Sequence, residues 1–284
     1  MKMLKRISAV IFSVLMLMSF AFCFVSAEDN VKKNINFVVI GDSIAEGFGV
    51  ANEDDAAYGR IVADTNGYNY VNYAAVANDT KDLLYKLENR SDIIKSIEKA
   101  DIINLCIGSN NYLANDDVVL ITAGAIFGVN DKQLDEIAED MFKDYLVIYD
   151  TIRELNPDAV LIIDNIYCAW RGLGHIPFIK AVNRINANIN KLCEEHDDII
   201  IFDTNSVITH NTELIADDCV HPNAKGNVEL ARHFLQLLKE NGLGENTEPV
   251  ILTPGIDYNF YQENFGKLFG TIIQYIVKVL TLNF

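Results

Sequence analysis

The sequence is short of positive charge and of closely spaced cysteines. Its 284 residues contain 23 Lys and Arg against 40 Asp and Glu, which gives a net charge of -17 at pH 7. Such a chain repels phosphate backbones and anionic lipid head groups, which argues against a nucleic-acid partner. None of the five cysteines stands near another, so no cysteine pair of the zinc-binding type occurs. Internal repeats and low-complexity tracts are also absent.

Half of the residues are apolar and 22% are charged, which is too apolar for a disordered chain and too evenly mixed for a protein that crosses a membrane many times. The first 27 residues have the pattern of a signal peptide. The apolar run Ile7 to Val25 follows a basic stub, and Val25-Ser26-Ala27 suits signal peptidase. We expect cleavage after Ala27 and a secreted or extracytoplasmic protein. A retained envelope anchor is the alternative, because the run approaches the roughly 20 residues that span a bilayer. A lipoprotein linked through Cys23 is the weaker alternative, because bulky Phe22 precedes it.

Four cysteines remain after such cleavage: Cys106, Cys168, Cys193 and Cys219. An even count in an exported protein permits disulfides without requiring them, and we predict no particular bridge. Cys106 lies within an apolar run, where we expect a buried thiol.

Apolar runs rich in β-branched residues alternate with helical patterns. The expected strands are Ile35 to Ile40, Tyr68 to Ala74, Asp101 to Ile107, Ala159 to Ile166 and Ile199 to Asp203. Apolar residues recur at three- and four-residue steps over 134–155, 179–192 and 231–238, with Asn223 as a candidate N-cap of the last helix and Gly242 just past its end. This order predicts an α/β domain with a five-stranded, mainly parallel sheet between helices, over residues 28–240. Ligands bind such sheets at the carboxyl ends of the strands.

The composition changes near residue 241. Residues 241–263 predict a linker or a wrapping loop, and residues 264–284 predict an amphipathic helix with a wide apolar face. We expect this helix to dock on its own domain or on a second copy. Weak binding at a membrane interface is the alternative.

A candidate nucleophile follows the first strand directly. Gly41-Asp42-Ser43 places Ser43 at a strand-to-helix turn, where its hydroxyl can face the crevice. Serine is a poor nucleophile without a base, a group that orients the base, and donors for the oxyanion.

The candidate base is His221, because Pro222 disfavours helical backbone there and keeps the imidazole on a loop. Asp218 stands three residues earlier, a spacing that lets its carboxylate fold back on the imidazole. The other histidines lack a comparable acid and proline nearby. His175, expected in the loop after the fourth strand, is nevertheless a further residue that could reach the crevice at the end of the sheet.

Candidate oxyanion donors follow the first, second and third strands. They are the side-chain amide of Asn110, within Gly108-Ser109-Asn110-Asn111, and the backbone N–H groups of Ala77 and Ser43. Each fragment alone is weak, because Asn and Gly after strands usually make turns. All of them nevertheless converge at one end of the predicted sheet.

These four blocks resemble those of the SGNH or GDSL hydrolase family, in its bacterial lipase and esterase branch, over about residues 35–240. The resemblance implies a flavodoxin-like α/β/α sandwich without a metal or organic cofactor. It implies Ser43 as nucleophile and first oxyanion donor, Ala77 at the glycine position of the second block, Asn110 as third donor, and a triad completed by Asp218 and His221.

Two positions depart from the family pattern. Ala77 keeps the backbone N–H of the usual glycine but adds a methyl group. Asn111 stands where the third block commonly has Asp, which removes a charge but leaves the amide of Asn110.

The residues thus predict a carboxylic ester hydrolase that works through an acyl-serine. Lipid acyl esters and O-acetyl groups of a polysaccharide stay open as substrates; the apolar run Val118 to Phe127 is either the wall of an acyl pocket or a core helix. A catalytically silent binding or envelope-associated protein is the rival prediction, and acyl transfer to another alcohol is the third. The acidic clusters Glu53-Asp54-Asp55 and Asp116-Asp117 lack calcium-loop spacing and predict solvated surface.

Overall fold

A computed structural model describes residues 34–115, 131–170 and 175–260 of the chain. The chain divides into two units, Met1–Asn34 and Ile35–Phe284, and the fold given below is that of the second. The predicted signal peptide, the run from Val118 to Phe127, Asp116-Asp117 and the C-terminal helix lie outside the described residues. Within the described residues, no helix has the length and apolarity to cross a membrane.

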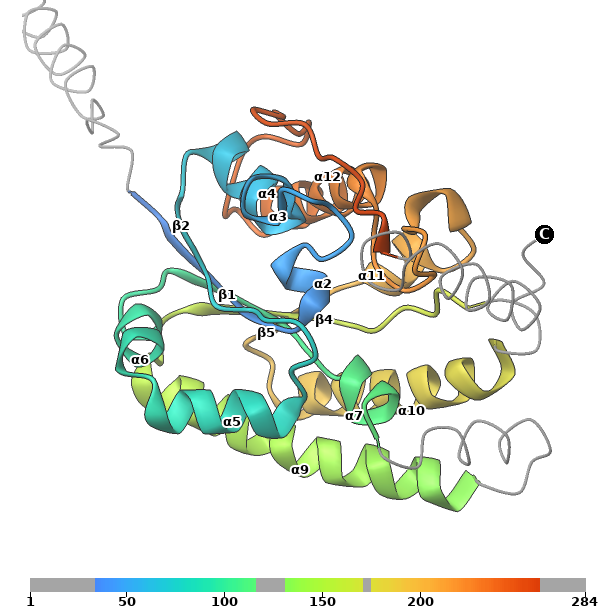
Figure 1. Ribbon diagram of the computed structural model, residues 1–284. Coiled ribbons are helices and arrows are strands. Elements are labelled where there is room, and N and C mark those ends of the chain that lie inside the picture. Colours follow the sequence, from blue (N-terminus) through green and yellow to red (C-terminus); the bar gives the residue numbers. More distant parts are fainter. Residues whose placement is uncertain (1–33, 116–130, 171–174, 261–284) are drawn as a thin grey trace, which may run out of the picture. The chain divides into compact units, whose positions relative to one another are not determined.

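A five-stranded sheet in the order β2-β1-β3-β4-β5 forms the centre of the fold (Figure 1). Its strands are β1 (Asn36–Gly41), β2 (Asn69–Asn72), β3 (Ile102–Cys106), β4 (Val160–Asp164) and β5 (Ile199–Phe202). All four pairings are parallel. The predicted α/β fold class is confirmed, and the strand order is the flavodoxin-like one.

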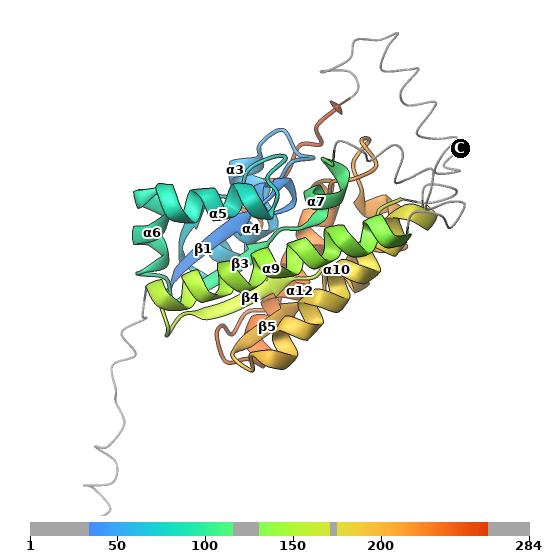
Figure 2. The same cartoon turned by 90° about the horizontal axis from the view of Figure 1, so that it is seen from below.

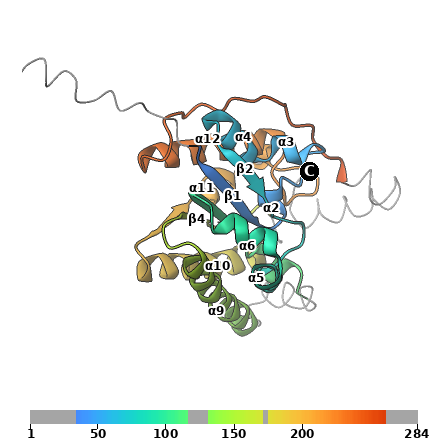
Figure 3. The same ribbon diagram turned by 90° about the vertical axis from the view of Figure 1, so that its left-hand side faces the viewer.

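Helices cover both faces of the sheet, as Figures 2 and 3 show. The helices on one face are α5 (Thr80–Asn89), α6 (Ser91–Ile97), α7 (Ser109–Leu113), α9 (Asp131–Leu155) and α10 (His175–Glu195). Those on the other are α2 (Ser43–Glu46), α4 (Tyr58–Asn66), α11 (Thr204–Ile208) and α12 (Ala224–Glu240), with α3 (Glu53–Ala56) beside α4 and the short 3-10 helix η2 (Thr212–Leu214) before α12.

The central strands are apolar on both faces because each face is covered. In β1, Val38 and Ile40 pack with α5, α9 and α10, whereas Phe37 and Val39 pack with α4 and α12. The near-continuous apolar runs in the sequence therefore encode buried parallel strands. Asn223 caps α12 as predicted, since its side chain accepts the N–H of Gly226 at 2.9 Å. His175, expected in a loop, is instead the first residue of α10.

The carboxyl ends of β1 and β3 approach each other closely. A side chain at Gly41 would put its Cβ 2.0 Å from the carbonyl oxygen of Cys106, so only glycine fits there. The next residue, Asp42, donates its backbone N–H to the same carbonyl at 2.9 Å. The chain reverses its winding direction at β1 and β3, and this is where doubly wound sheets bind their ligands.

A buried polar network lies within the sheet and α4. The Tyr58 hydroxyl is 2.7 Å from Asn104 Oδ1 and 2.8 Å from Asp164 Oδ2, and the Asn104 amide donates to Asp164 at 2.5 Å. One hydroxyl hydrogen cannot serve two oxygens, so a protonated Asp164 that donates to Tyr58 satisfies both contacts. Burial raises the pKa of Asp164 to about 7, which favours that form.

Candidate active site

Ser43 begins the single-turn helix α2, directly after β1. Asp42 caps this turn, because its side chain accepts the N–H of Ile44 at 3.0 Å, and Gly47 ends the turn with a φ of 97°. The Ser43 residue is only 5% exposed. The sharp strand-to-helix turn thus holds its hydroxyl at the carboxyl edge of the sheet.

Ser43, His221 and Asp218 form one chain of hydrogen bonds. Ser43 Oγ lies 2.8 Å from His221 Nε2, although 178 positions separate the two residues. His221 Nδ1 lies 2.6 Å from Asp218 Oδ2. This is the arrangement in which a carboxylate orients an imidazole that can take a proton from a hydroxyl.

Local backbone contacts hold the carboxylate of Asp218 in place. Its second oxygen, Oδ1, accepts the backbone N–H groups of Val220 at 2.9 Å and His221 at 3.0 Å. Cys219, between Asp218 and Val220, has a φ of 64°, a left-handed conformation that tightens the turn. Burial alone would raise the pKa of Asp218, but the hydrogen bonds and charge of His221 and the backbone donors outweigh it and lower that pKa below its ordinary value. The lowered pKa keeps the Asp218 carboxylate ionised beside the His221 imidazole.

The loops after β1, β2 and β3 are fastened to one another through amide side chains. Asn110, in the first turn of α7, donates from Nδ2 to the backbone oxygen of Asn78 at 2.8 Å. Asn78 in turn donates from its own side chain to the oxygen of Gly41 at 3.1 Å. An amide nitrogen carries two hydrogens, so the bond to Asn78 fixes the Asn110 side chain and leaves its second N–H for another acceptor.

Ala77 has a left-handed backbone, with a φ of 63°. An L-residue pays about 1–2 kcal/mol for this conformation, whereas glycine adopts it freely. The backbone at position 77 therefore has a conformation that favours glycine, the residue usual in the family pattern. Alanine adopts the same conformation here.

Asn111 has a separate structural contact. Its amide donates to Thr80 Oγ1 at 2.7 Å, and its oxygen accepts the Thr80 N–H at 3.3 Å. Thr80 also donates to Asp144 on α9 at 2.5 Å. Asn111 thus ties α7 to the start of α5.

Sequence reasoning missed the residues that pack directly on the imidazole. The Phe48 ring lies 4.7 Å from the ring of His221, measured between centroids. A Cβ at Gly49 would come within 2.4 Å of the carbonyl oxygen of Pro222, so the nucleophile loop lies flat against the histidine loop only because residue 49 is glycine. The pair of glycines around Phe48 was the signal in the sequence.

Asp42 is a further buried acid, next to the candidate nucleophile Ser43. Burial raises its pKa to about 7, against the opposing effects of the Ile44 N–H and of His221. Its Oδ2 has no hydrogen-bond partner within the described part of the chain. Asp42 therefore shapes the turn before Ser43 and is distinct from the carboxylate that orients His221.

The remaining candidates lie elsewhere. His175 Nδ1 is 3.0 Å from the backbone oxygen of Trp170, and His196 stacks on Tyr149. The four described cysteines are free thiols. Asp54 and Asp55 are exposed on α3, and the residues described by the structure include no group of three or more His, Cys, Asp or Glu side chains that could hold a metal ion.

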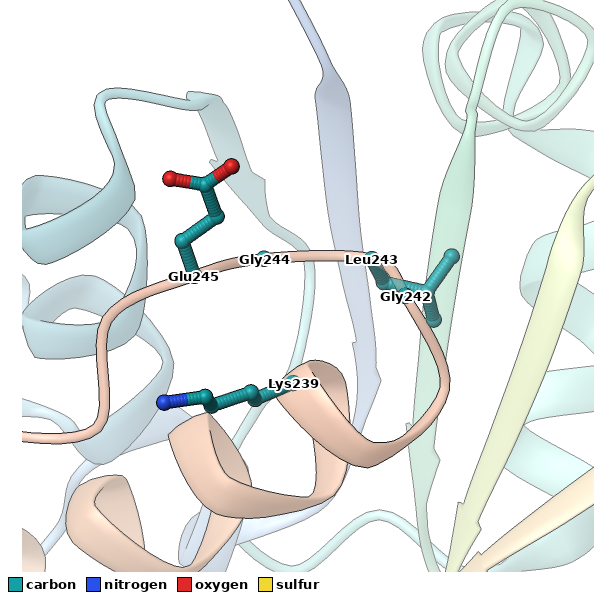
Figure 4. A pocket seen from close by; sticks show the side chains of 5 residues that line it. All are labelled: Lys239, Gly242, Leu243, Gly244 and Glu245. Carbon is teal, nitrogen blue, oxygen red and sulfur yellow. The ribbon is translucent and has the colours of Figure 1, made fainter.

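Two hollows differ in their relation to these residues. One of about 710 Å³ lies at the end of α12, between Lys239 and residues 242–245 (Figure 4), and none of its lining comes from the loops after β1, β2 or β3. A smaller one of about 150 Å³ is lined by Asn110, Asn111 and Asp79 among others, next to the candidate oxyanion donor. The second is the one that adjoins the candidate site.

Comparisons with known proteins agree with this geometry. The fold is similar to three solved structures: a lipase from a goat rumen metagenome (20% identity, TM-score 0.61, covering 74% of this chain and 99% of the other), phospholipase A1 from Streptomyces albidoflavus (17%, 0.54, 72% and 98%) and an acetylxylan esterase from Geobacillus stearothermophilus (19%, 0.53, 75% and 95%). Among curated proteins none matches the sequence. The family model of the GDSL-like lipases and acylhydrolases matches residues 39–228, which is more than half of the chain. The resemblance predicted from the sequence is thus confirmed: the chain belongs to the GDSL-like lipase/acylhydrolase family.

Proposed function

We propose that the protein is an extracytoplasmic serine esterase that cleaves carboxylic esters through an acyl-enzyme on Ser43. The observation that carries the proposal is the continuous contact from Ser43 Oγ through His221 to Asp218, at 2.8 and 2.6 Å. Membership of a lipase and acylhydrolase family supports the same reaction class.

In the first half of the reaction, Ser43 Oγ attacks the ester carbonyl while His221 Nε2 takes its proton. The charged Asp218 stabilises the imidazolium that forms and holds its tautomer. His221 then gives the proton to the departing alcohol oxygen, which leaves the acyl group on Ser43. In the second half, water loses a proton to His221 and attacks the acyl carbonyl. The bond from the acyl carbon to Ser43 Oγ then breaks, Ser43 Oγ takes the proton from His221, and the acid leaves.

Negative charge develops on the carbonyl oxygen in both halves. We assign the oxyanion donors as the backbone N–H groups of Ser43 and Ala77 and the free N–H of the Asn110 amide. Three features favour this assignment: the left-handed turn at Ala77, the bond that fixes Asn110 to Asn78, and the bond from Asn78 to the oxygen of Gly41. Donors fixed before the reaction cost no reorganisation when the charge appears.

The covalent step is tested with a fluorophosphonate probe. We expect the wild-type protein to be labelled on one residue, and Ser43→Ala and His221→Ala to remain unlabelled while keeping the folded circular dichroism spectrum. Folded wild-type protein that takes no label would refute the proposal and favour a silent binding protein with the same fold.

The substrate class is separated by a panel of esters. The fold is shared with a lipase, a phospholipase A1 and an acetylxylan esterase, so the panel contains short and long acyl esters, a phospholipid and acetylated xylan. Product analysis with an added alcohol distinguishes hydrolysis from acyl transfer.

Export is the remaining element of the proposal, and it rests on the pattern of residues 1–27. Expression of the full chain in a bacterium, followed by fractionation and N-terminal sequencing, tests it. A mature protein that begins at Glu28 outside the cytoplasm agrees with export, and an intact chain in the cytoplasm contradicts it.

A further inference from the structure

The segment that follows α12 contacts the loops that carry the candidate catalytic residues. It continues along α4, where the Asn246 side chain donates to the oxygen of Thr65 at 3.1 Å and the Val250 N–H donates to Thr65 Oγ1 at 2.9 Å. Figure 3 shows this extended segment crossing over α4 and α3 before it turns back. The last described part, residues 254–260, is called the C-terminal strap here.

The C-terminal strap is bonded to the loop that follows the nucleophile. The Asn52 side chain donates to the oxygen of Pro254 at 3.1 Å and accepts the N–H of Ile256 at 2.9 Å. Backbone bonds join Ala51 to Ile256 and Tyr258 to Gly49, at 2.6 and 2.9 Å. The strap therefore lies antiparallel to the nucleophile loop, paired at Val50 and Asp257.

The same strap is bonded to the loop that carries His221. Asp257 Oδ1 accepts the N–H of Ala224 at 2.9 Å, and Asp217 Oδ1 accepts the N–H of Phe260 at 3.2 Å. The crossing is tight, because a Cβ at Gly255 would lie 2.8 Å from the Cβ of Ala224. The strap thus joins the nucleophile loop to the histidine loop.

Aromatic rings connect the C-terminal strap to the imidazole of His221. Tyr258 and Phe260 each meet Phe48 edge to face, with centroid distances of 5.6 and 6.2 Å. Phe48 in turn lies 4.7 Å from the ring of His221. Edge-to-face packing on a large planar ring restricts how far that ring can tilt or slide. The imidazole side chain is only 14% exposed, so Phe48 forms a substantial part of its surroundings.

We propose that the C-terminal strap is a positioning element of the active site: Tyr258 and Phe260 hold Phe48 against His221 and so keep its Nε2 at the Ser43 hydroxyl. The strap lies beyond residue 228, where the match to the family model ends. The consequence for the reaction rests on the function proposed above; the consequence for the orientation of the imidazole does not.

The experiment uses the full chain, four single variants and one double variant. Tyr258→Ala removes the nearer of the two strap rings that contact Phe48, and Tyr258→Phe keeps that ring. Phe48→Leu removes the ring beside the imidazole while filling most of its volume. Leu252→Ala is the matched control, since Leu252 lies two residues before the strap and is 67% exposed.

We expect Tyr258→Ala to lower kcat on the order of 10- to 100-fold, because small misplacements of a catalytic group cost about that much. KM should stay within about twofold, since the strap acts on the base and not on substrate binding. Tyr258→Phe should restore most of kcat, and Leu252→Ala should match the wild type. The double variant Tyr258→Ala/Phe48→Leu should be no slower than Phe48→Leu alone, because both act through one contact. Equal rates for Tyr258→Ala and Leu252→Ala, or additive losses in the double variant, would overturn the proposal.

A second measurement is independent of turnover. The ring protons of His221, assigned in NMR spectra by comparison with His221→Ala, should shift in Tyr258→Ala and not in Leu252→Ala, because the Phe48 ring moves. An unchanged His221 signal overturns the strap proposal even in a protein that hydrolyses no ester. If the wild type neither turns over esters nor takes the fluorophosphonate label, but the signal moves as expected, the proposed function fails and the positioning contact stands.

Discussion

Replacing Asn110 by alanine tests the oxyanion assignment directly, because the neighbouring Asn111 supplies a control with a similar expected loss of stability. The substitution removes the amide N–H that we assign to the oxyanion. Loss of one such donor raises the activation barrier by about 2.7–4 kcal/mol, which lowers kcat by about 10²–10³-fold. The same change leaves the backbone oxygen of the buried Asn78 without its 2.8 Å donor. A lost bond of this kind costs about 1–2 kcal/mol of stability.

Asn111→Ala is the matched control, because it changes the same residue type one position further along α7. It removes the bonds at 2.7 and 3.3 Å to Thr80 and should lower the free energy of unfolding by a similar amount, about 1–2 kcal/mol. Since Asn111 faces Thr80 and not the oxyanion, its kcat should fall by no more than about threefold.

The assay measures kcat and KM on a soluble short-chain ester and the free energy of unfolding in urea, for both variants. We expect similar losses of stability and a difference in kcat of at least about 30-fold. If the two variants lose turnover equally, the effect of Asn110 is structural and its oxyanion role is refuted. Near-normal turnover of Asn110→Ala would refute it as well.

Three further predictions concern single residues. Ala77→Gly should stabilise the protein by about 0.5 kcal/mol, because relief of the left-handed conformation slightly exceeds the entropy cost of glycine, and should not lower kcat; a loss of more than about 1 kcal/mol in urea denaturation would contradict the strain at φ 63°. Asp218→Asn should lower kcat on the order of 10⁴-fold without unfolding the protein, because the amide no longer stabilises the imidazolium; stopped assays with high enzyme concentration measure it. The third concerns Asp164, whose pKa is raised from 3.8 to about 7. Proton uptake then favours the folded state, so its contribution is complete below pH 4 and disappears as the pH rises through 7. Urea denaturation of Asp164→Asn between pH 4 and 8 should therefore show a smaller fall in stability than the wild type, and parallel profiles would count against a protonated Asp164.

Much of the fold could be predicted because local pattern encodes it. The strand from Asp101 to Ile107 is apolar at almost every position, which fits only a strand covered on both faces, and β3 has that environment. The strand limits were predicted less exactly. The expected strand from Tyr68 to Ala74 is regular only over Asn69–Asn72, although Tyr73 and Ala75 still donate backbone N–H groups to β1 at 2.8 and 3.1 Å. The helix start at His175 was missed, because the apolar repeat that indicated this helix begins only at Ile179.

The sequence by itself determined which side chains reach the carboxyl edge of the sheet. Ser43 and Asn110 each follow a strand, and parallel strands end at the same edge, so their convergence was implied by chain order. The turn from Asp218 to His221 was local enough to be predicted from its spacing and Pro222. Short-range rules suffice where the partners are a few residues apart or are placed by regular elements.

Only the tertiary structure decided how the site is enclosed and held. The contact between Phe48 and Tyr258, the flat packing of Gly49 on Pro222 and the bond between Asp257 and Ala224 join segments whose separation along the chain leaves no periodic trace in the sequence. Their geometry depends on where α12 ends and how the chain crosses α4, and those positions follow from packing of the whole domain. For this reason the candidate catalytic residues could be named from the sequence, whereas the ring that packs on the imidazole could be found only in three dimensions.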